Sequence, residues 1–419
     1  MQKIFIPFSI LLLFISRFSF FQPRIPNETF FSELPKGKDS VIVGAARFDQ
    51  YLPLLKGKSV AIFANQTTVV GGKHLVDLLK EKGVSIKKIF SPEHGFRGTA
   101  DAGEKVNSSI DAGTGIQIIS LYGEHKMPSA EELSDVDIMI FDIQDVGVRF
   151  YTYISSLEYF LASAIENNKP VILLDRPNPN ADYVDGPVLN KKFKSFVGMQ
   201  SIPVVYGMTL GEYAKMLLGE KWIDDGIMQK NDWPMGLKKK FQLTVVPCSN
   251  YTHATKYILP VKPSPNLPDI QSVYAYPTTC FFEGTVLSEG RGTEEPFRLF
   301  GHPSLPNTLK SFTPKSVEGA KNPKLLNETC YGWEISGSPD EVKKKVGGKI
   351  QLKWIIDAYK LFPDKDKFFL ANGYFNKLAG NDELMQQIKS GQSETSIRKS
   401  WQNDLQNFKL IRKKYLIYP

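Results

Sequence analysis

Short segments rich in apolar residues recur along the first half of the chain, and more polar stretches separate them. The five segments cover Val60–Phe63, Ile86–Phe90, Ile116–Leu121, Asp137–Phe141 and Val171–Leu174. Strands that are apolar on both faces are typical of a parallel sheet whose two faces are covered by other elements. The pattern therefore predicts five strands in the interior of one sheet.

Helical patterns lie between these strands. His74–Lys82 places leucines on one face and is followed by Gly83, and Tyr153–Asn167 predicts a longer helix. Strands that alternate with helices predict a Rossmann-like, doubly wound α/β domain, here from about residue 41 to residue 205. No Gly-x-Gly-x-x-Gly pattern follows the first strand, so nothing indicates a dinucleotide site.

A second region, predicted over residues 206–419, is more mixed. It opens with a helix at Thr209–Leu218, and Val317–Ile356 has the pattern of strands followed by a helix. The prolines of Val261–Pro268 predict an extended loop, because each proline fixes its own φ and restrains the residue before it. A final amphipathic helix is expected over Ser396–Lys414, with an apolar stripe that packs against the protein.

The N-terminus resembles a secretory signal peptide. Lys3 precedes an apolar stretch at Ile4–Ile15, which matches an apolar core of about 7–15 residues and falls short of the roughly 20 residues of a membrane span. Residues 1–22 are therefore predicted to be a signal peptide or, because no small-x-small cleavage site follows, an uncleaved N-terminal anchor. The expected location is periplasmic or extracellular, with membrane contact only through this segment.

Composition adds little specificity. The 419 residues include 52 Lys plus Arg against 44 Asp plus Glu, and the basic residues are scattered apart from Lys238–Lys240 and Arg412–Lys414. We expect no nucleic-acid partner, whereas a mild positive field would suit an anionic polymer such as peptidoglycan. Three distant cysteines form no zinc or redox motif, which leaves open one disulfide or three buried thiols.

Each predicted strand is followed by polar residues, and in a parallel sheet ligands bind at the carboxyl ends of the strands. We therefore expect one shared site at this edge. Its candidate residues are Asn65, Gln66, Glu93, His94, Glu124, His125, Asp142, Gln144, Asp145, Asp175 and Arg176.

Glu93 and Glu124 are the candidate catalytic pair. Glycoside cleavage uses a proton donor and commonly a second carboxylate that stabilises the oxocarbenium-like centre. Neighbouring strands lie about 4.8 Å apart, so the ends of two adjacent strands can hold such a pair. Either glutamate could instead cap the helix or loop that follows it.

Other chemistries have weaker support. His94 and His125 with Asp142 and Asp145 offer possible zinc or manganese ligands, but the spacing matches no metal signature, and hydrogen bonds to the substrate or to the glutamates are the expected role. No Gly-x-Ser-x-Gly elbow is present for a serine nucleophile. We expect neither a metal nor another cofactor.

Arginines and aromatic residues near the same loops could bind an anionic sugar. Arginine is the natural bidentate partner of a carboxylate, and aromatic rings can pack on a pyranose face. The candidates are Arg97, Arg149, Arg176, Tyr122, Tyr151 and Tyr153, together with Glu289 and Arg291 in the Gly-rich loop Phe281–Arg298. Any of the arginines could instead serve in a structural ion pair.

Seven motifs at these loops resemble those of one known family. They are Ser91–Gly98, Leu121–Pro128, Phe141–Tyr153, Leu174–Asn180, Asp185–Leu189, Pro263–Pro268 and Phe282–Thr293. The chain is similar to the NamZ-type exo-β-N-acetylmuramidases, a glycoside hydrolase family, from about Val41 to its C-terminus. One departure is Asp185, where a Glu is expected ahead of Gly186, and this change concerns a contact at the rim of the site.

The resemblance implies a Rossmann-like catalytic domain with a C-terminal α+β auxiliary domain. It also implies removal, without a metal, of N-acetylmuramic acid from the non-reducing end of β-1,4-linked, peptidoglycan-derived sugars during cell-wall recycling. The two motif glutamates of the family fall on Glu93, expected as general acid/base, and Glu124, expected as its partner. If the 2-acetamido group of the substrate acts as internal nucleophile, Glu124 would only orient it.

Two other functions remain open at this point. One is an exported binding protein for cell-wall fragments, and the other is a metal-dependent hydrolase that uses His94 and His125. A binding protein would have no use for a proton donor, so the pair Glu93 and Glu124 favours the glycosidase.

Overall fold

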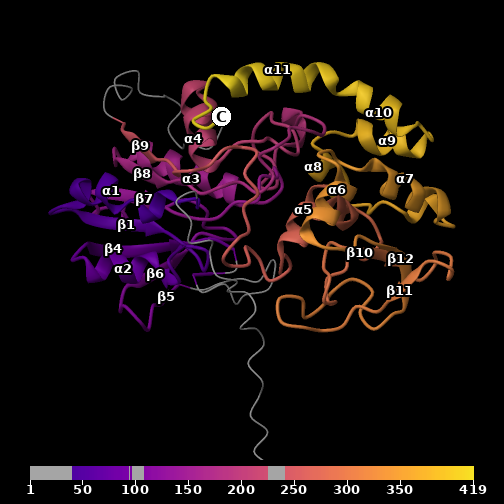
Figure 1. Ribbon diagram of the computed structural model, residues 1–419, viewed down its shortest axis with the longest axis horizontal. Coiled ribbons are helices and arrows are strands. Elements are labelled where there is room, and N and C mark those ends of the chain that lie inside the picture. Colours follow the sequence, from indigo (N-terminus) through magenta and orange to yellow (C-terminus); the bar gives the residue numbers. More distant parts are fainter. Residues whose placement is uncertain (1–39, 94, 97–107, 225–240) are drawn as a thin grey trace, which may run out of the picture.

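The structure is a computed structural model that describes residues 40–93, 95–96, 108–224 and 241–419. Figure 1 shows two lobes side by side, the first built mainly from the N-terminal half of the chain and the second from the C-terminal half. The predicted signal segment and the predicted site residues His94 and Arg97 lie outside the described residues. Within the described part of the chain, no helix is both long and apolar enough to cross a bilayer.

A seven-stranded sheet forms the centre of the first lobe, in the order β5-β6-β4-β1-β7-β8-β9. All neighbouring strands are parallel except the edge strand β5. Its strands are β1 (Ser59–Phe63), β4 (Ser85–Ser91), β5 (Ser109–Ile110), β6 (Gln117–Ser120), β7 (Ile138–Phe141), β8 (Val171–Leu174) and β9 (Leu243–Val246). The five predicted strands are confirmed as the middle of this sheet.

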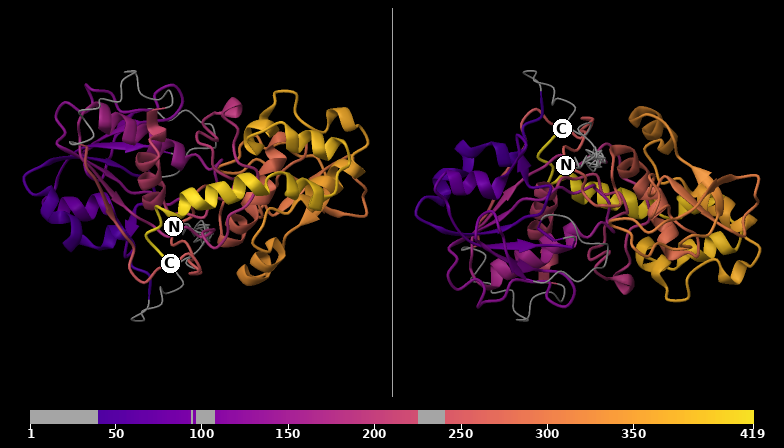
Figure 2. Two further views of the ribbon diagram at one scale, coloured as in Figure 1. Left: turned by 90° about the horizontal axis from the view of Figure 1, so that it is seen from above. Right: turned by 90° about the horizontal axis from the view of Figure 1, so that it is seen from below.

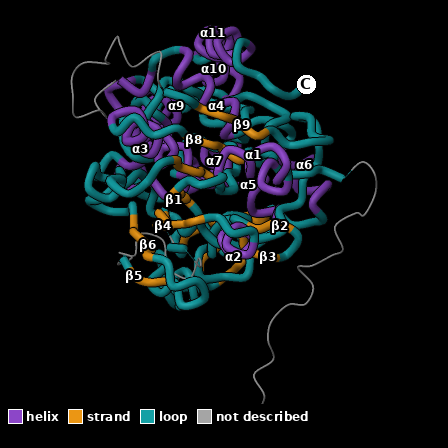
Figure 3. The backbone as a smooth tube through the Cα atoms, turned by 90° about the vertical axis from the view of Figure 1, so that its left-hand side faces the viewer, coloured by secondary structure: helices purple, strands orange, loops and turns teal. Residues whose placement is uncertain are grey.

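Helices cover both faces of the sheet, as the apolar strands require. Alternate residues along β1 point to opposite faces: Ile62 joins a core with helices α1 (Phe48–Leu55) and α2 (Leu75–Glu81), and Phe63 joins a core with α3 (Tyr153–Glu166) and α4 (Leu210–Gly219). Figure 3 shows the strands between α3 on one side and α1 with α2 on the other. The predicted doubly wound α/β fold is confirmed.

The first domain reaches further along the chain than predicted. Strand β9 pairs with β8 in parallel, although it lies well beyond residue 205, where the sequence predicted this domain to end. Helix α4 also packs against α3. Four short elements complete this part, namely η2 (Gly44–Ala46), the hairpin β2 (Val69–Val70) with β3 (Lys73–His74), η3 (Lys191–Phe193) and η4 (Trp222–Asp224).

The second lobe is α+β, as predicted. Its three-stranded antiparallel sheet has the order β10-β12-β11, with β10 (Leu299–His302), β11 (Lys310–Phe312) and β12 (Cys330–Glu334). Its helical elements are α5 (Ile270–Thr279), η6 (Cys280–Gly284), α6 (Pro339–Val346), α7 (Leu352–Leu361), η7 (Lys365–Lys367), α8 (Tyr374–Ala379), α9 (Glu383–Lys389), α10 (Glu394–Ser400) and α11 (Gln402–Lys413). The single helix predicted over Ser396–Lys414 is therefore two helices that meet at Trp401.

The C-terminal segment returns to the first domain. Helix α11 runs from the second lobe back across the molecule (Figure 2), and the residues after it dock beside α4. There the backbone amides of Ile417 and Tyr418 donate to Glu212, and the Tyr418 hydroxyl donates to Asp175 at 2.7 Å. All three cysteines are buried free thiols, which settles the alternative left open by the sequence.

Candidate active site

A cavity of about 290 Å³ lies between the two domains at the carboxyl edge of the large sheet. The first domain contributes Glu93 after β4, Tyr122 after β6, and Tyr151 and Tyr153 at the start of α3. The second domain contributes a wall of polar and aromatic side chains: Tyr276, Glu283, Arg291, Phe297 and Tyr374. A sugar could therefore contact both domains at once.

Glu93 faces a group of tyrosines in this cavity. The Tyr122 hydroxyl donates a hydrogen bond of 3.1 Å to Oε1 of Glu93. Burial, and after it the charge of Glu93, raises the pKa of Tyr122 well above its usual range. Burial likewise raises the pKa of Tyr151 and Tyr153, with Glu93 contributing to both. Around neutral pH these hydroxyls are therefore neutral donors and acceptors.

Asn65 and Gln66, the predicted site residues after β1, do not line the cavity but form hydrogen bonds with residues around it. Asn65 is fully buried and donates from Nδ2 to the Tyr153 hydroxyl at 2.9 Å. Gln66 donates to the carbonyl of Pro263 at 3.1 Å, and the Tyr151 hydroxyl donates to the same carbonyl at 2.7 Å. The predicted proline-rich loop Val261–Pro268 is thereby fixed against the sheet edge.

Glu124 follows a strand next to that of Glu93, since β4 and β6 pair directly and Ser91 faces Ser120. This adjacency was the condition on which the predicted pair depended. Glu124 is nevertheless exposed and is not among the residues that line the cavity. Its neighbour His125 is turned to another partner, Glu132, at 3.0 Å. A catalytic role for Glu124 stays a prediction from the sequence.

Four of the predicted polar residues after β7 and β8 belong to buried networks. Arg176 forms a bidentate ion pair with Asp142, with contacts of 2.6 and 2.8 Å, and both side chains are almost completely buried. Asp175 accepts hydrogen bonds from Thr209 and Tyr418, and Gln144 donates to two backbone carbonyls. These four side chains are buried, and none of them is among the residues that line the cavity. The structure therefore does not bring them to the cavity, and their contact with a sugar stays a prediction from the sequence.

Arg149 is also a structural residue and not a reader of a ligand carboxylate. It is fully buried, and its two terminal nitrogens donate to four backbone carbonyls at 2.7–2.9 Å. Two carbonyls, of Pro187 and Ile202, belong to the first domain, and two, of Leu378 and Ala379, belong to the second. The guanidinium thus joins the domains behind the cavity.

Among the described residues, the arginine that lines the cavity is Arg291 of the second domain, one of the arginines that the sequence proposed. Its Nη2 donates to Glu283 at 2.6 Å, and its Nε lies 3.2 Å from Glu289. Glu289 itself is buried behind this pair and also contacts Lys324 at 3.0 Å. Sequence reasoning missed Glu283 and Tyr374. Glu283 could have been found from its place in the motif Phe282–Thr293, whereas nothing local marks Tyr374.

Metal ligation finds no support in the described geometry. Asp142 is paired with Arg176, and His125 with Glu132, so these two predicted ligands do not converge. Within the ranges that the structure describes, no three His, Cys, Asp or Glu side chains are grouped as around a metal ion.

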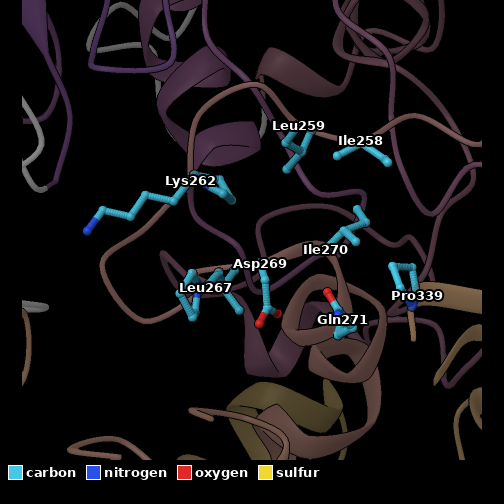
Figure 4. A pocket seen from close by; sticks show the side chains of 10 residues that line it. Ile258, Leu259, Lys262, Leu267, Asp269, Ile270, Gln271 and Pro339 are labelled. Carbon is cyan, nitrogen blue, oxygen red and sulfur yellow. The ribbon is translucent and has the colours of Figure 1, made fainter. Parts of the chain in front are cut away.

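A second, more apolar cavity of about 200 Å³ lies along the same loop and continues to the start of α5. Figure 4 shows Leu259, Ile258 and Ile270 around it, with Lys262 extending from its edge. Leu267 lines both cavities, so the loop Val261–Pro268 separates them.

A doubly wound domain presents a carboxylate at its strand ends, and a second domain with further charged and aromatic groups closes the site, so the class that this geometry fits is a two-domain enzyme with the groups that glycoside cleavage uses. Family models for the N-terminal and C-terminal parts of the exo-β-N-acetylmuramidase NamZ match residues 60–271 and 274–418. The chain belongs to this family and is a glycoside hydrolase. The two matched ranges meet beyond β9, in agreement with the sheet.

Individual relatives agree with this assignment. The chain is 38% identical over 390 residues to the peptidoglycan β-N-acetylmuramidase NamZ of Bacillus subtilis, covering 88% of this chain and 89% of that protein. Crystal structures of two DUF1343 family proteins from Bacteroides fragilis share 44% and 26% sequence identity with it, with TM-scores of 0.80 and 0.75. Each covers 90% of this chain and 99% of the solved chain.

Proposed function

We propose that this enzyme releases N-acetylmuramic acid from the non-reducing end of β-1,4-linked, peptidoglycan-derived sugars, and that Glu93 is its general acid/base. The observation that carries the proposal is the position of Glu93 in the interdomain cavity, where its carboxylate is reached by the Tyr122 hydroxyl and bordered by neutral tyrosines. The Bacillus subtilis relative is a peptidoglycan β-N-acetylmuramidase, which supports the choice of substrate.

The size of the cavity supports cleavage at a chain end. Its volume of about 290 Å³ lies at the lower limit of small-molecule sites, which is about 300 Å³. A space of this size suits one sugar unit better than several. The aromatic rings of Tyr151, Phe297 and Tyr374 offer apolar surface for a pyranose face.

Arg291 is proposed to bind the lactyl carboxylate of the muramic acid. A guanidinium has five N–H donors, and the contacts of Arg291 with Glu283 and Glu289 use one at Nη2 and one at Nε. Donors on the Nη1 side remain for a ligand, as far as the described residues show. An Arg291→Gln variant should therefore lose preference for a chromogenic β-N-acetylmuraminide over the matching β-N-acetylglucosaminide, which lacks the carboxylate. Equal loss on both substrates would remove Arg291 from this role.

The decisive test is Glu93→Gln, assayed with a chromogenic β-N-acetylmuraminide. We expect the rate to fall about 10²–10⁴-fold, the usual contribution of general acid/base catalysis, with the unfolding transition unchanged. Glu132→Gln is the matched control, because it makes the same chemical change at a partly exposed residue outside the cavity. Undiminished turnover by Glu93→Gln would show that another group supplies the proton.

A binding protein is distinguished by product analysis. Incubation of the purified protein with a disaccharide that carries N-acetylmuramic acid at its non-reducing end should yield the free sugar. If the disaccharide is bound but stays intact, the protein is a receptor for cell-wall fragments and not a hydrolase of them.

Export is proposed from the sequence of residues 1–22, where a basic residue precedes a short apolar core. Fractionation of cells that express the full chain should place the protein outside the cytoplasm, and removal of residues 1–22 should retain it inside. Cytoplasmic recovery of the full chain would contradict this proposal.

A further inference from the structure

The C-terminal domain supplies a second carboxylate to the cavity. Glu283, at the end of η6, lines the same space as Glu93 but comes from the other domain. Its side chain is 16% exposed, and it is among the residues that line the cavity. Glu124, the partner expected from the sequence, is exposed outside this space. Of the residues that the structure describes, the two glutamates that line the cavity are therefore Glu93 and Glu283.

Tyr374 lies near both of these carboxylates. Its hydroxyl is 3.5 Å from Oε2 of Glu283, in position to donate a hydrogen bond. Burial raises the pKa of Tyr374 well above its usual range, and the charge of Glu283 and, more weakly, that of Glu93 add to the shift. Both glutamates thus act on one hydroxyl, which is expected if they face a common ligand space.

The backbone of Glu283 is held rigidly. Nζ of Lys324 lies 2.9–3.2 Å from the carbonyl oxygens of Phe282, Glu283, Thr285 and Leu287, which share its three N–H donors. Gly284 packs so closely on α8 that an added Cβ would lie 2.5 Å from the Cα of Phe375. A side chain on such a support keeps one orientation, and this is what electrostatic stabilisation of a transition state requires.

Arg291 holds the Glu283 side chain in place. Its Nη2 donates to Oε1 of Glu283 at 2.6 Å, in an ion pair between two mostly buried side chains. The other oxygen, Oε2, is the one that faces the Tyr374 hydroxyl.

We propose that Glu283 is the second catalytic carboxylate and stabilises the positive charge that develops on the sugar as the glycosidic bond breaks. This inference rests on the proposed function, since it assumes that Glu93 donates the proton to the leaving oxygen. It changes the expected pair from two strand ends of one sheet to one residue from each domain. The C-terminal domain is then part of the catalytic centre.

The test compares variants of Glu283 and uses substrates that differ in their leaving group. Glu283→Gln should lower kcat about 10²-fold or more, with a much smaller change in KM, because the stabilised charge exists only in the transition state. Glu283→Asp, which keeps the charge, should recover part of this loss. Glu295→Gln is the matched control: it lies in the same loop and pairs with Arg298 at 2.9 Å, but it does not line the cavity. Its kcat should stay within twofold of the wild-type value.

Leaving groups separate the two glutamates. In a 2,4-dinitrophenyl muraminide the leaving group departs as dinitrophenolate and needs no proton. This substrate should therefore restore the bond-breaking step in Glu93→Gln and leave Glu283→Gln slow. The inference is overturned if Glu283→Gln turns over within threefold of the wild type, if its loss lies in KM alone, or if dinitrophenyl restores it as fully as Glu93→Gln. A large loss in Glu124→Gln together with an active Glu283→Gln would return the role to Glu124. If Glu93→Gln itself is fully active on both substrates, the proposed function fails instead.

Discussion

Replacement of Arg149 by methionine tests whether this arginine joins the domains or serves the ligand. Methionine keeps much of the side-chain length but removes the four donors to the carbonyls of Pro187, Ile202, Leu378 and Ala379. Hydrogen bonds that involve a charged group contribute about 1.5–3 kcal/mol each, so the four give a gross loss of at least about 6 kcal/mol. The variant no longer has to bury a charged guanidinium, and this offsets several kcal/mol of the loss. We expect a net loss of about 3–5 kcal/mol in the free energy of unfolding.

Urea unfolding, followed by circular dichroism and tryptophan fluorescence, measures this loss. Arg47→Met is the control, because Arg47 is only partly buried and donates to a single carbonyl, that of Pro247, at 2.9 Å. It should cost about 1 kcal/mol. The reasoning is refuted if Arg149→Met is no less stable than Arg47→Met. It is also refuted if Arg149→Met raises KM for the muraminide without loss of stability, since that is the behaviour of a ligand-binding arginine.

Three further predictions concern stability. Burial raises the pKa of Glu158 to about 7, above its ordinary 4.5, so the folded state binds the proton more tightly than the unfolded state. The free energy of unfolding should therefore fall by up to about 3 kcal/mol as pH rises from 4.5 to 7. Glu158→Gln removes this titration, so its stability relative to the wild type should be higher in urea titrations at pH 7.5 than at pH 5, and a constant difference would contradict the assignment. Tyr418→Phe removes hydrogen bonds with Asp175 and the amide of Cys248, and thermal unfolding should report a cost of about 2 kcal/mol. Gly147→Ala should destabilise more strongly, because φ is +77° and the new Cβ would lie 2.1 Å from Oδ1 of Asn178; an unchanged melting temperature would show that this loop can move.

The fold was predictable where local pattern and burial coincide. β1, β4, β7 and β8 end in strongly apolar residues that are buried on both faces, so their character is visible in the sequence. β9 was missed because its residues are mostly half-buried and a long insertion separates it from β8. The boundary predicted at residue 205 failed for this reason: it assumed that the sheet ended with the last apolar segment.

The site was predictable only in part. Topology brings the residues after parallel strands to one edge, and this is sufficient to place Glu93. Topology does not distinguish a polar side chain that faces a cavity from one that forms a buried ion pair. Asp142 and Arg176, which pair with each other, therefore matched the pattern as well as Glu93 did. Glu283 and Tyr374 meet Glu93 only through the packing of two domains, which no local spacing encodes.

The docking of residues 415–418 on the first domain has a consequence for synthesis and engineering. Asp175 and Glu212 sit in the interior of the N-terminal half, yet they receive hydrogen bonds from Tyr418 and Ile417. As the polypeptide emerges from the ribosome, these carboxylates lack their C-terminal partners until residues 417 and 418 have been made. A fragment cut between the two family regions would lose these hydrogen bonds, and an affinity tag fused directly after Pro419 would crowd this same junction.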